Sequence, residues 1–77
     1  MQSKIENPMN ESDRTNSFIK LDQFLKWQGI TQTGGEAKVR IQEGEVIVNG
    51  KIETRRGKKL ITGDRVTIAN KTYMVNL

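Results

Sequence analysis

The stretch that decides the fold covers residues 49–65 and reads Asn49-Gly50-Lys51-Ile52-Glu53-Thr54-Arg55-Arg56-Gly57-Lys58-Lys59-Leu60-Ile61-Thr62-Gly63-Asp64-Arg65. It begins with Asn-Gly, a strong signal for a hairpin turn, and closes on a Gly-Asp turn. Between the turns, residues 51–59 carry five cations and one acid, a local charge of +4. Unpaired charges are not buried, so we expect a positive ridge on the surface, fixed by strands on both sides. Such a ridge suits polyphosphate, with nucleic acid as the first candidate.

Outward from this stretch, short apolar runs bounded by turn residues predict strands. The predicted strands are Val46–Val48, Lys51–Glu53, Leu60–Ile61, Arg65–Ile68 and Thr72–Val75. Asn70-Lys71 is assigned to the turn before the last strand. Phe18-Ile19 is compatible with a further short strand at the edge of the core.

A first helix is predicted over about residues 21–28. Leu21, Phe24, Leu25 and Gln28 fall on one face of it, and Asp22 in its first turn complements the helix dipole. Gly29 is the expected end of the helix. Trp27 lies about 110° from the centre of the apolar face. We therefore predict a boundary residue that packs partially, with stacking on an exposed base as the alternative.

A second helix is predicted to start at Thr33-Gly34-Gly35-Glu36, which fits a capping box. The helix runs to about Glu43 and ends at Gly44, with Ala37 and Ile41 as its buried pair. Two helices followed by a small antiparallel sheet make an α+β domain. We assign residues 18–77 to this domain and residues 1–17, which are polar and aperiodic, to a flexible tail.

Composition excludes several chemistries. The 77 residues contain no cysteine and no histidine, which removes disulfides, thiolate chemistry, Cys/His zinc sites and imidazole catalysis. Residues 1–16 hold two cations and three acids, a net −1, whereas residues 17–77 hold eleven cations and six acids, a net +5. No apolar run has the length of a membrane span or the form of a signal peptide. We therefore expect a cytoplasmic protein without membrane contact.

Four blocks of the sequence together resemble the S-four RNA-binding domain, also called the αL motif. They are Leu21-Asp22-Gln23-Phe24-Leu25, Gly35-Glu36-Ala37-Lys38, Glu43-Gly44-Glu45-Val46-Ile47-Val48-Asn49-Gly50 and Gly63-Asp64-Arg65-Val66. The resemblance covers about residues 18–75. The segment from Thr54 to Leu60 is further similar to the small stand-alone bacterial subfamily of the YaaA/YbcJ type. This resemblance implies binding of structured ribosomal or transfer RNA, with both helices and the adjoining loop facing the RNA.

The resemblance also implies which side chains would contact RNA. These are Lys20 before the first helix, Lys38 on the second helix, and Arg55, Arg56, Lys58 and Lys59 in the basic loop. Many family members carry Ser or Arg where this chain has Gly34 and Gly35. The glycines weaken the case for a base contact but leave backbone N–H groups open to phosphate. The second helix and the Arg55–Lys59 loop are expected to line one groove.

The acidic residues do not suggest catalysis. Asp64 is expected to fix its own turn, Asp22 and Glu36 start helices, and no nucleophile stands beside a base. We therefore expect that the chain is not an enzyme and has no metal, cofactor or small-molecule substrate. The resemblance implies that the partner is ribosomal or transfer RNA or a ribosomal particle, and we expect a monomer. The alternative is a protein-interaction adaptor or β-grasp-type module with an acidic partner. Reversing Arg55 and Arg56 to Glu is expected to abolish RNA binding and leave thermal unfolding nearly unchanged.

Overall fold

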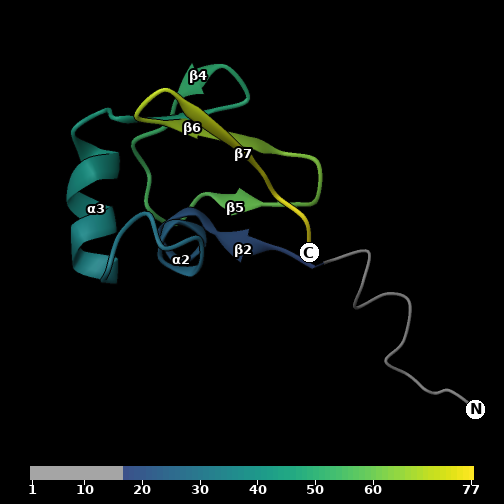
Figure 1. The fold of residues 1–77 in the computed structure, drawn as a ribbon, viewed down its shortest axis with the longest axis horizontal. Coiled ribbons are helices and arrows are strands. Elements are labelled where there is room, and N and C mark those ends of the chain that lie inside the picture. Colours follow the sequence, from purple (N-terminus) through teal and green to yellow (C-terminus); the bar gives the residue numbers. More distant parts are fainter. Residues whose placement is uncertain (1–16) are drawn as a thin grey trace, which may run out of the picture.

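The computed structural model describes residues 17–77, which contain two helices and six short strands (Figure 1). In chain order the elements are β2 (Ile19–Lys20), α2 (Leu21–Trp27), α3 (Gly34–Gln42), β3 (Val46–Val48), β4 (Lys51–Ile52), β5 (Lys59–Leu60), β6 (Arg65–Ile68) and β7 (Lys71–Met74). The predicted α+β class is confirmed. The predicted tail, residues 1–17, lies outside the described residues except for its last position.

The strands form two antiparallel sheets. Four strands pair in the order β4-β3-β6-β7, and β2 pairs separately with β5. In the larger sheet, Val46 pairs with Ile68 and Val48 with Val66, so one face of β3 and β6 is apolar. In the two-stranded ribbon, Ile19 pairs with Leu60 and Lys20 with Lys59. In Figure 1, the β2–β5 ribbon lies below the larger sheet, with α2 directly after β2.

Both helices end in the way that their glycines predict. Gly29 and Gly44 have φ values of 74° and 80°, in the left-handed region that favours glycine. The Gly29 N–H donates to the Lys26 carbonyl, and the Ile30 N–H donates to the Leu25 carbonyl. The same pattern of two hydrogen bonds ends α3. These bonds satisfy carbonyls that the last helical turn would otherwise leave without a partner.

The predicted cap of α3 is confirmed in outline. The Glu36 N–H donates to the Thr33 hydroxyl at 3.0 Å. The Glu36 carboxylate accepts from the N–H of Gln32 at 3.0 Å, one residue earlier than a standard capping box would place it. Both side chains therefore fix the start of α3.

One hairpin matches the sequence prediction and one is shifted. Asn49 and Gly50 have φ values of 51° and 86°, as a two-residue hairpin turn requires. The second turn is Ala69-Asn70, with φ values of 53° and 66°, and the assignment to Asn70-Lys71 was wrong. The reason is the strand register: Ile68 pairs with Lys71, so Lys71 belongs to β7.

The core lies between the helices and the two sheets. Its buried apolar residues are Ile19, Leu21, Phe24, Leu25, Ala37, Ile41, Val46, Val48, Leu60, Val66, Ile68 and Val75. The predicted buried positions Leu21, Phe24, Leu25, Ala37 and Ile41 are thus confirmed. Gln28, which was predicted on the same face as Leu21, is exposed because α2 ends one residue before it. The β2–β5 ribbon contributes Ile19 and Leu60 to this core. Their pairing holds two positions that are far apart in the sequence side by side in the fold.

Candidate functional site

The basic segment, residues 55–59, is anchored on the beginning of α2. The Leu21 N–H donates to the Lys58 carbonyl at 2.9 Å, and the Asp22 N–H donates to the Arg56 carbonyl at 3.1 Å. The first N–H groups of a helix have no partner within the helix. Carbonyl groups of the basic segment fill that role here, so its backbone is held by α2.

A side-chain ion pair strengthens this anchor. Arg56 Nε lies 3.0 Å from Asp22 Oδ2, and the Asp22 side chain is only 9% exposed. The other oxygen of Asp22 accepts from the Gln23 N–H at 2.8 Å. Asp22 thus does more than complement the helix dipole, because it also binds the basic segment. The geometry argues against the expectation that reversing the charge of Arg56 would leave unfolding unchanged.

Arg55 is paired as well, but within its own loop. Its Nε and Nη2 donate to Glu53 Oε2 at 2.9 Å and Oε1 at 3.1 Å, and its backbone N–H donates to Oε2 at 3.0 Å. These hydrogen bonds from Arg55 lower the pKa of Glu53 to about 2, and the Glu53 carboxylate in turn raises the pKa of Arg55. The Arg55 side chain remains 72% exposed, so it stays open to further partners.

The lowered pKa of Glu53 predicts a pH-dependent contribution to stability. The unfolded chain ionises Glu53 near pH 4.5, and the folded chain keeps it ionised down to about pH 2. The contribution is therefore fully present above pH 4.5 and is lost as the pH falls towards 2. Because the Arg55 side chain is exposed, we expect ionised Glu53 to contribute at most about 1 kcal/mol to the free energy of unfolding. Denaturant unfolding of wild type and Glu53→Gln should show a gap at pH 6 that closes near pH 2; a constant gap would contradict the pairing.

Lys20 and Lys59 are brought together by the β2–β5 ribbon. They are a cross-strand pair, and both are exposed, whereas the neighbouring pair Ile19 and Leu60 is buried. Side chains opposite each other in an antiparallel ribbon have Cβ atoms about 4.5–5.5 Å apart, and like charges there are unfavourable. None of the ion pairs found within residues 17–77 involves either lysine. The two ammonium groups therefore form a local positive site.

The remaining predicted cations are placed differently. Lys58 is half-buried, and Lys38 is exposed on α3 next to the buried Ala37. Within residues 17–77, the backbone hydrogen bonds between the basic segment and a helix go to α2. The contacts therefore join the basic segment to the first helix, and the groove expected between this segment and the second helix stays a prediction.

Trp27 and the two glycines that open α3 also differ from expectation in part. Trp27 is 74% exposed, so the prediction of partial packing was wrong. The helix ends at Trp27, and the turn at Gly29 brings Ile30 against the core in its place. Gly34 and Gly35 open α3 with ample space, because a Cβ atom at Gly34 would meet nothing within 4 Å. The aromatic ring is available for stacking, and the glycines leave the helix start accessible.

A side-chain clip between the two turns was missed from the sequence. Asn49 Nδ2 donates to Asp64 Oδ1 at 3.1 Å, and the Arg65 N–H donates to Asn49 Oδ1 at 2.9 Å. Asp64 Oδ2 also accepts from the Ile61 N–H at 2.9 Å, so the predicted turn-fixing role of Asp64 is confirmed. The clip explains why Asn-Gly and Gly-Asp occur together. These turn residues support the strands that border the basic segment.

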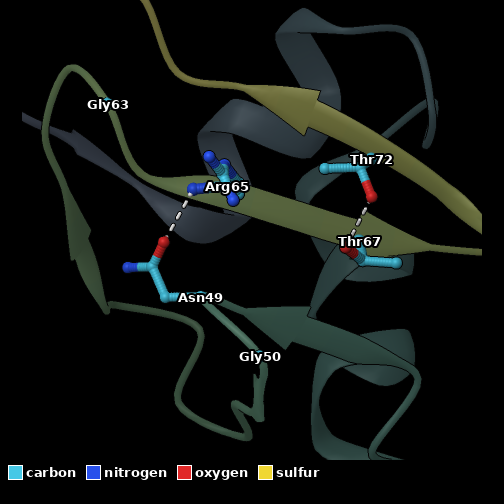
Figure 2. A pocket seen from close by; sticks show the side chains of 6 residues that line it. All are labelled: Asn49, Gly50, Gly63, Arg65, Thr67 and Thr72. Carbon is cyan, nitrogen blue, oxygen red and sulfur yellow. Dashed lines mark hydrogen bonds between the residues drawn. The ribbon is translucent and has the colours of Figure 1, made fainter.

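The clip borders a hollow on the larger sheet (Figure 2). It is lined by Asn49, Gly50, Gly63, Arg65, Thr67 and Thr72. The hydroxyls of Thr67 and Thr72 lie 2.9 Å apart and satisfy each other across β6 and β7. The hollow therefore holds mostly groups that already have partners, and we do not assign the main site to it.

Two negative observations concern only the described part of the chain. Residues 17–77 contain no group of three or more His, Cys, Asp or Glu side chains placed to hold a metal ion. In the same residues, neither helix has the length and apolar character needed to cross a membrane.

Comparison with known proteins yields one family and two informative relatives. A family model described as "S4 domain" matches residues 13–76. A Bacillus subtilis protein named "Probable ribosome maturation protein RlbA" is 50% identical over 51 residues, which cover 66% of this chain and 72% of that protein. An Escherichia coli protein named "Putative RNA-binding protein YbcJ" is 37% identical over 57 residues, covering 74% of this chain and 81% of that protein.

Proposed function

This chain belongs to the S4 domain family, as its sequence motifs indicated, and from that premise we propose that it binds structured ribosomal RNA without catalysing a reaction on it. The family and the names of both relatives support RNA binding in general. The name of the Bacillus subtilis relative refers to ribosome maturation, which favours ribosomal RNA or an assembly particle as the target.

The observation that carries this proposal is the exposed lysine pair on the β2–β5 ribbon. The fold holds Lys20 and Lys59 opposite each other although their repulsion is unfavourable. An RNA phosphate between the two ammonium groups would turn that repulsion into attraction. Phosphate contacts of this kind supply most of the sequence-independent affinity for nucleic acid.

The neighbouring cations extend the proposed interface. Arg56 is 48% exposed on its side chain while it holds Asp22, so its free N–H groups can still reach a phosphate. Arg55, Lys58 and Lys38 are assigned as further backbone contacts. Trp27 and the open α3 start at Gly34 and Gly35 are assigned to base stacking and a phosphate contact, respectively. We propose that the protein does this as a monomer in the cytoplasm.

The salt dependence of binding tests this function directly. The carboxylates of Glu53 and Asp22 already compensate the charges of Arg55 and Arg56, so the slope is counted from the remaining cations of the proposed interface. These are Lys20, Lys38, Lys58 and Lys59. A plot of log affinity against log salt should therefore have a slope near −3, at roughly −0.7 to −0.9 per contact. The measurement uses wild-type protein and a fluorescent ribosomal RNA hairpin. Polyglutamate is the competitor that represents an acidic protein partner. A flat salt response, or displacement of the RNA by polyglutamate at equal charge concentration, would contradict RNA as the ligand.

A further inference from the structure

We propose that the outward face of the β2–β5 ribbon seats one unpaired nucleotide, with its base stacked on Phe18 and its phosphates held by Lys20 and Lys59. This inference rests on the proposed RNA binding and deepens it. It specifies that the RNA presents a bulged or looped-out nucleotide at this position, and it adds a side chain that the basic residues did not point to.

The register of the ribbon places Phe18 in this site. Ile19 pairs with Leu60 and Lys20 with Lys59, so the same antiparallel register continued by one residue sets Phe18 opposite Ile61. Side chains alternate between faces along a strand. Ile19 and Leu60 are 4% and 0% exposed, whereas Phe18 and Ile61 are 46% and 55% exposed. An aromatic ring, an aliphatic side chain and two lysines therefore share the outward face.

The chemistry of this face matches the parts of a nucleotide. Lys59 Nζ lies over the Phe18 ring, 4.8 Å from its centroid, in a cation–π contact. A nucleotide likewise offers a flat base next to a charged phosphate. A base that stacks on this face displaces the ammonium group towards the phosphate of the same nucleotide. Base stacking on an aromatic side chain is worth about 1–3 kcal/mol per base. Base stacking thus gives the half-exposed Phe18 ring a function that packing against the core does not provide.

The aromatic ring favours an unpaired nucleotide over a duplex. Within a duplex the faces of the bases are covered by their neighbours, so a ring cannot stack on them, whereas bulges and loops present splayed bases. On the outward face of the ribbon, duplex RNA would contact only Lys20 and Lys59. An acidic peptide would likewise engage the lysines and gain little from the ring. The dependence of affinity on Phe18 therefore separates an unpaired nucleotide from the other two ligands.

Two RNA hairpins of matched sequence test the inference, one with a single bulged nucleotide and one fully paired. Phe18→Leu keeps an apolar side chain but removes the aromatic face. We expect it to weaken binding to the bulged hairpin roughly 5- to 150-fold, as loss of one stacked base implies, and binding to the paired hairpin less than twofold. Phe18→Tyr should restore affinity for the bulged hairpin. Met74→Leu, at an apolar position on β7 that is 55% exposed, is the control and should change neither affinity.

The outcomes separate this inference from the proposed function. If wild type binds neither hairpin in a salt-dependent manner, RNA binding itself is wrong. If wild type binds both hairpins and Phe18→Leu weakens both equally or neither, RNA binding stands and the nucleotide seat is wrong. A melting temperature of Phe18→Leu equal to that of wild type shows that an affinity loss does not come from unfolding.

Discussion

Arg56→Ala is expected to lower the free energy of unfolding by about 2 kcal/mol, a large share of the stability of a domain of this size. The substitution leaves the Asp22 carboxylate, whose side chain is 9% exposed, without its guanidinium partner. Breaking a fully buried ion pair costs about 3–5 kcal/mol. Because Arg56 itself is 48% exposed, water can partly replace it, and we place the effect below that range.

Arg55→Ala is the matched control for this prediction. The two arginines are adjacent and carry the same charge, but Arg55 pairs within its own loop and its side chain is 72% exposed. Its removal should change the free energy of unfolding much less than the removal of Arg56, because water screens an exposed ion pair. Urea unfolding of both variants, with the double-mutant cycle of Asp22→Ala and Arg56→Ala, measures the coupling. Equal stability of the two arginine variants, or no coupling, would contradict the anchor.

The ion pair between Arg56 and Asp22 makes Arg56 unsuitable as the first variant for testing RNA binding. Glu at position 56 would face Asp22, so a charge reversal there combines loss of an anchor with loss of a contact to RNA. A drop in RNA binding would then not distinguish misfolding from a missing phosphate contact. The lysines of the β2–β5 ribbon offer a cleaner test.

Lys20→Glu together with Lys59→Glu is expected to weaken RNA binding roughly 100-fold at low salt, because two attractive contacts become repulsive ones. The slope of log affinity against log salt should shrink from near −3 to near −1.5 as two contacts are lost. Stability should fall by at most about 1 kcal/mol. Two glutamates opposite each other repel as the two lysines do, so the loss comes from the exposed contact between Lys59 and the Phe18 ring. Fluorescence anisotropy and thermal unfolding measure the two effects separately.

Lys51→Glu together with Lys71→Glu controls for overall charge. These lysines are exposed on the two edge strands of the larger sheet, β4 and β7, so the reversal changes the net charge by the same amount away from the ribbon. We expect only a few-fold loss of affinity from the weaker long-range attraction. An equal loss in both double variants would show that net charge, rather than the lysine pair, governs binding.

Local signals in the sequence predicted much of the fold. Gly29 and Gly44 end helices, Thr33 caps α3, and Asn49-Gly50 makes a hairpin, because each of these features is decided by a few neighbouring residues. The turn at Ala69-Asn70 was misplaced by one residue since alanine is a poor candidate for positive φ. Partial packing of Trp27 was predicted from helical periodicity alone. Periodicity does not show that the helix ends at Trp27, where the side chain is exposed.

The arrangement of the site depended on contacts between distant residues. The sequence identified Arg55, Arg56 and Lys59 as cations of one loop, but it could not show that Arg56 binds Asp22 or that Lys59 stands opposite Lys20. The strands concerned are two residues long, too short for a pattern to fix their pairing. Residues that looked equivalent in the sequence therefore have different roles. Arg56 anchors the basic segment, and Arg55 is paired within its own loop. Lys59 has no ion pair within residues 17–77 and lies over the Phe18 ring.

Backbone amide resonances of isotope-labelled protein, followed while a ribosomal RNA hairpin with a bulged nucleotide is added, test the central claim most directly. The claim is that RNA binds where the β2–β5 ribbon and the anchored basic segment meet. The largest changes are expected at Phe18, Lys20, Arg56 and Lys59, with little change at Thr67 and Thr72 on the larger sheet. Changes confined to Thr67, Thr72 and their neighbours, with the ribbon unaffected, would contradict it.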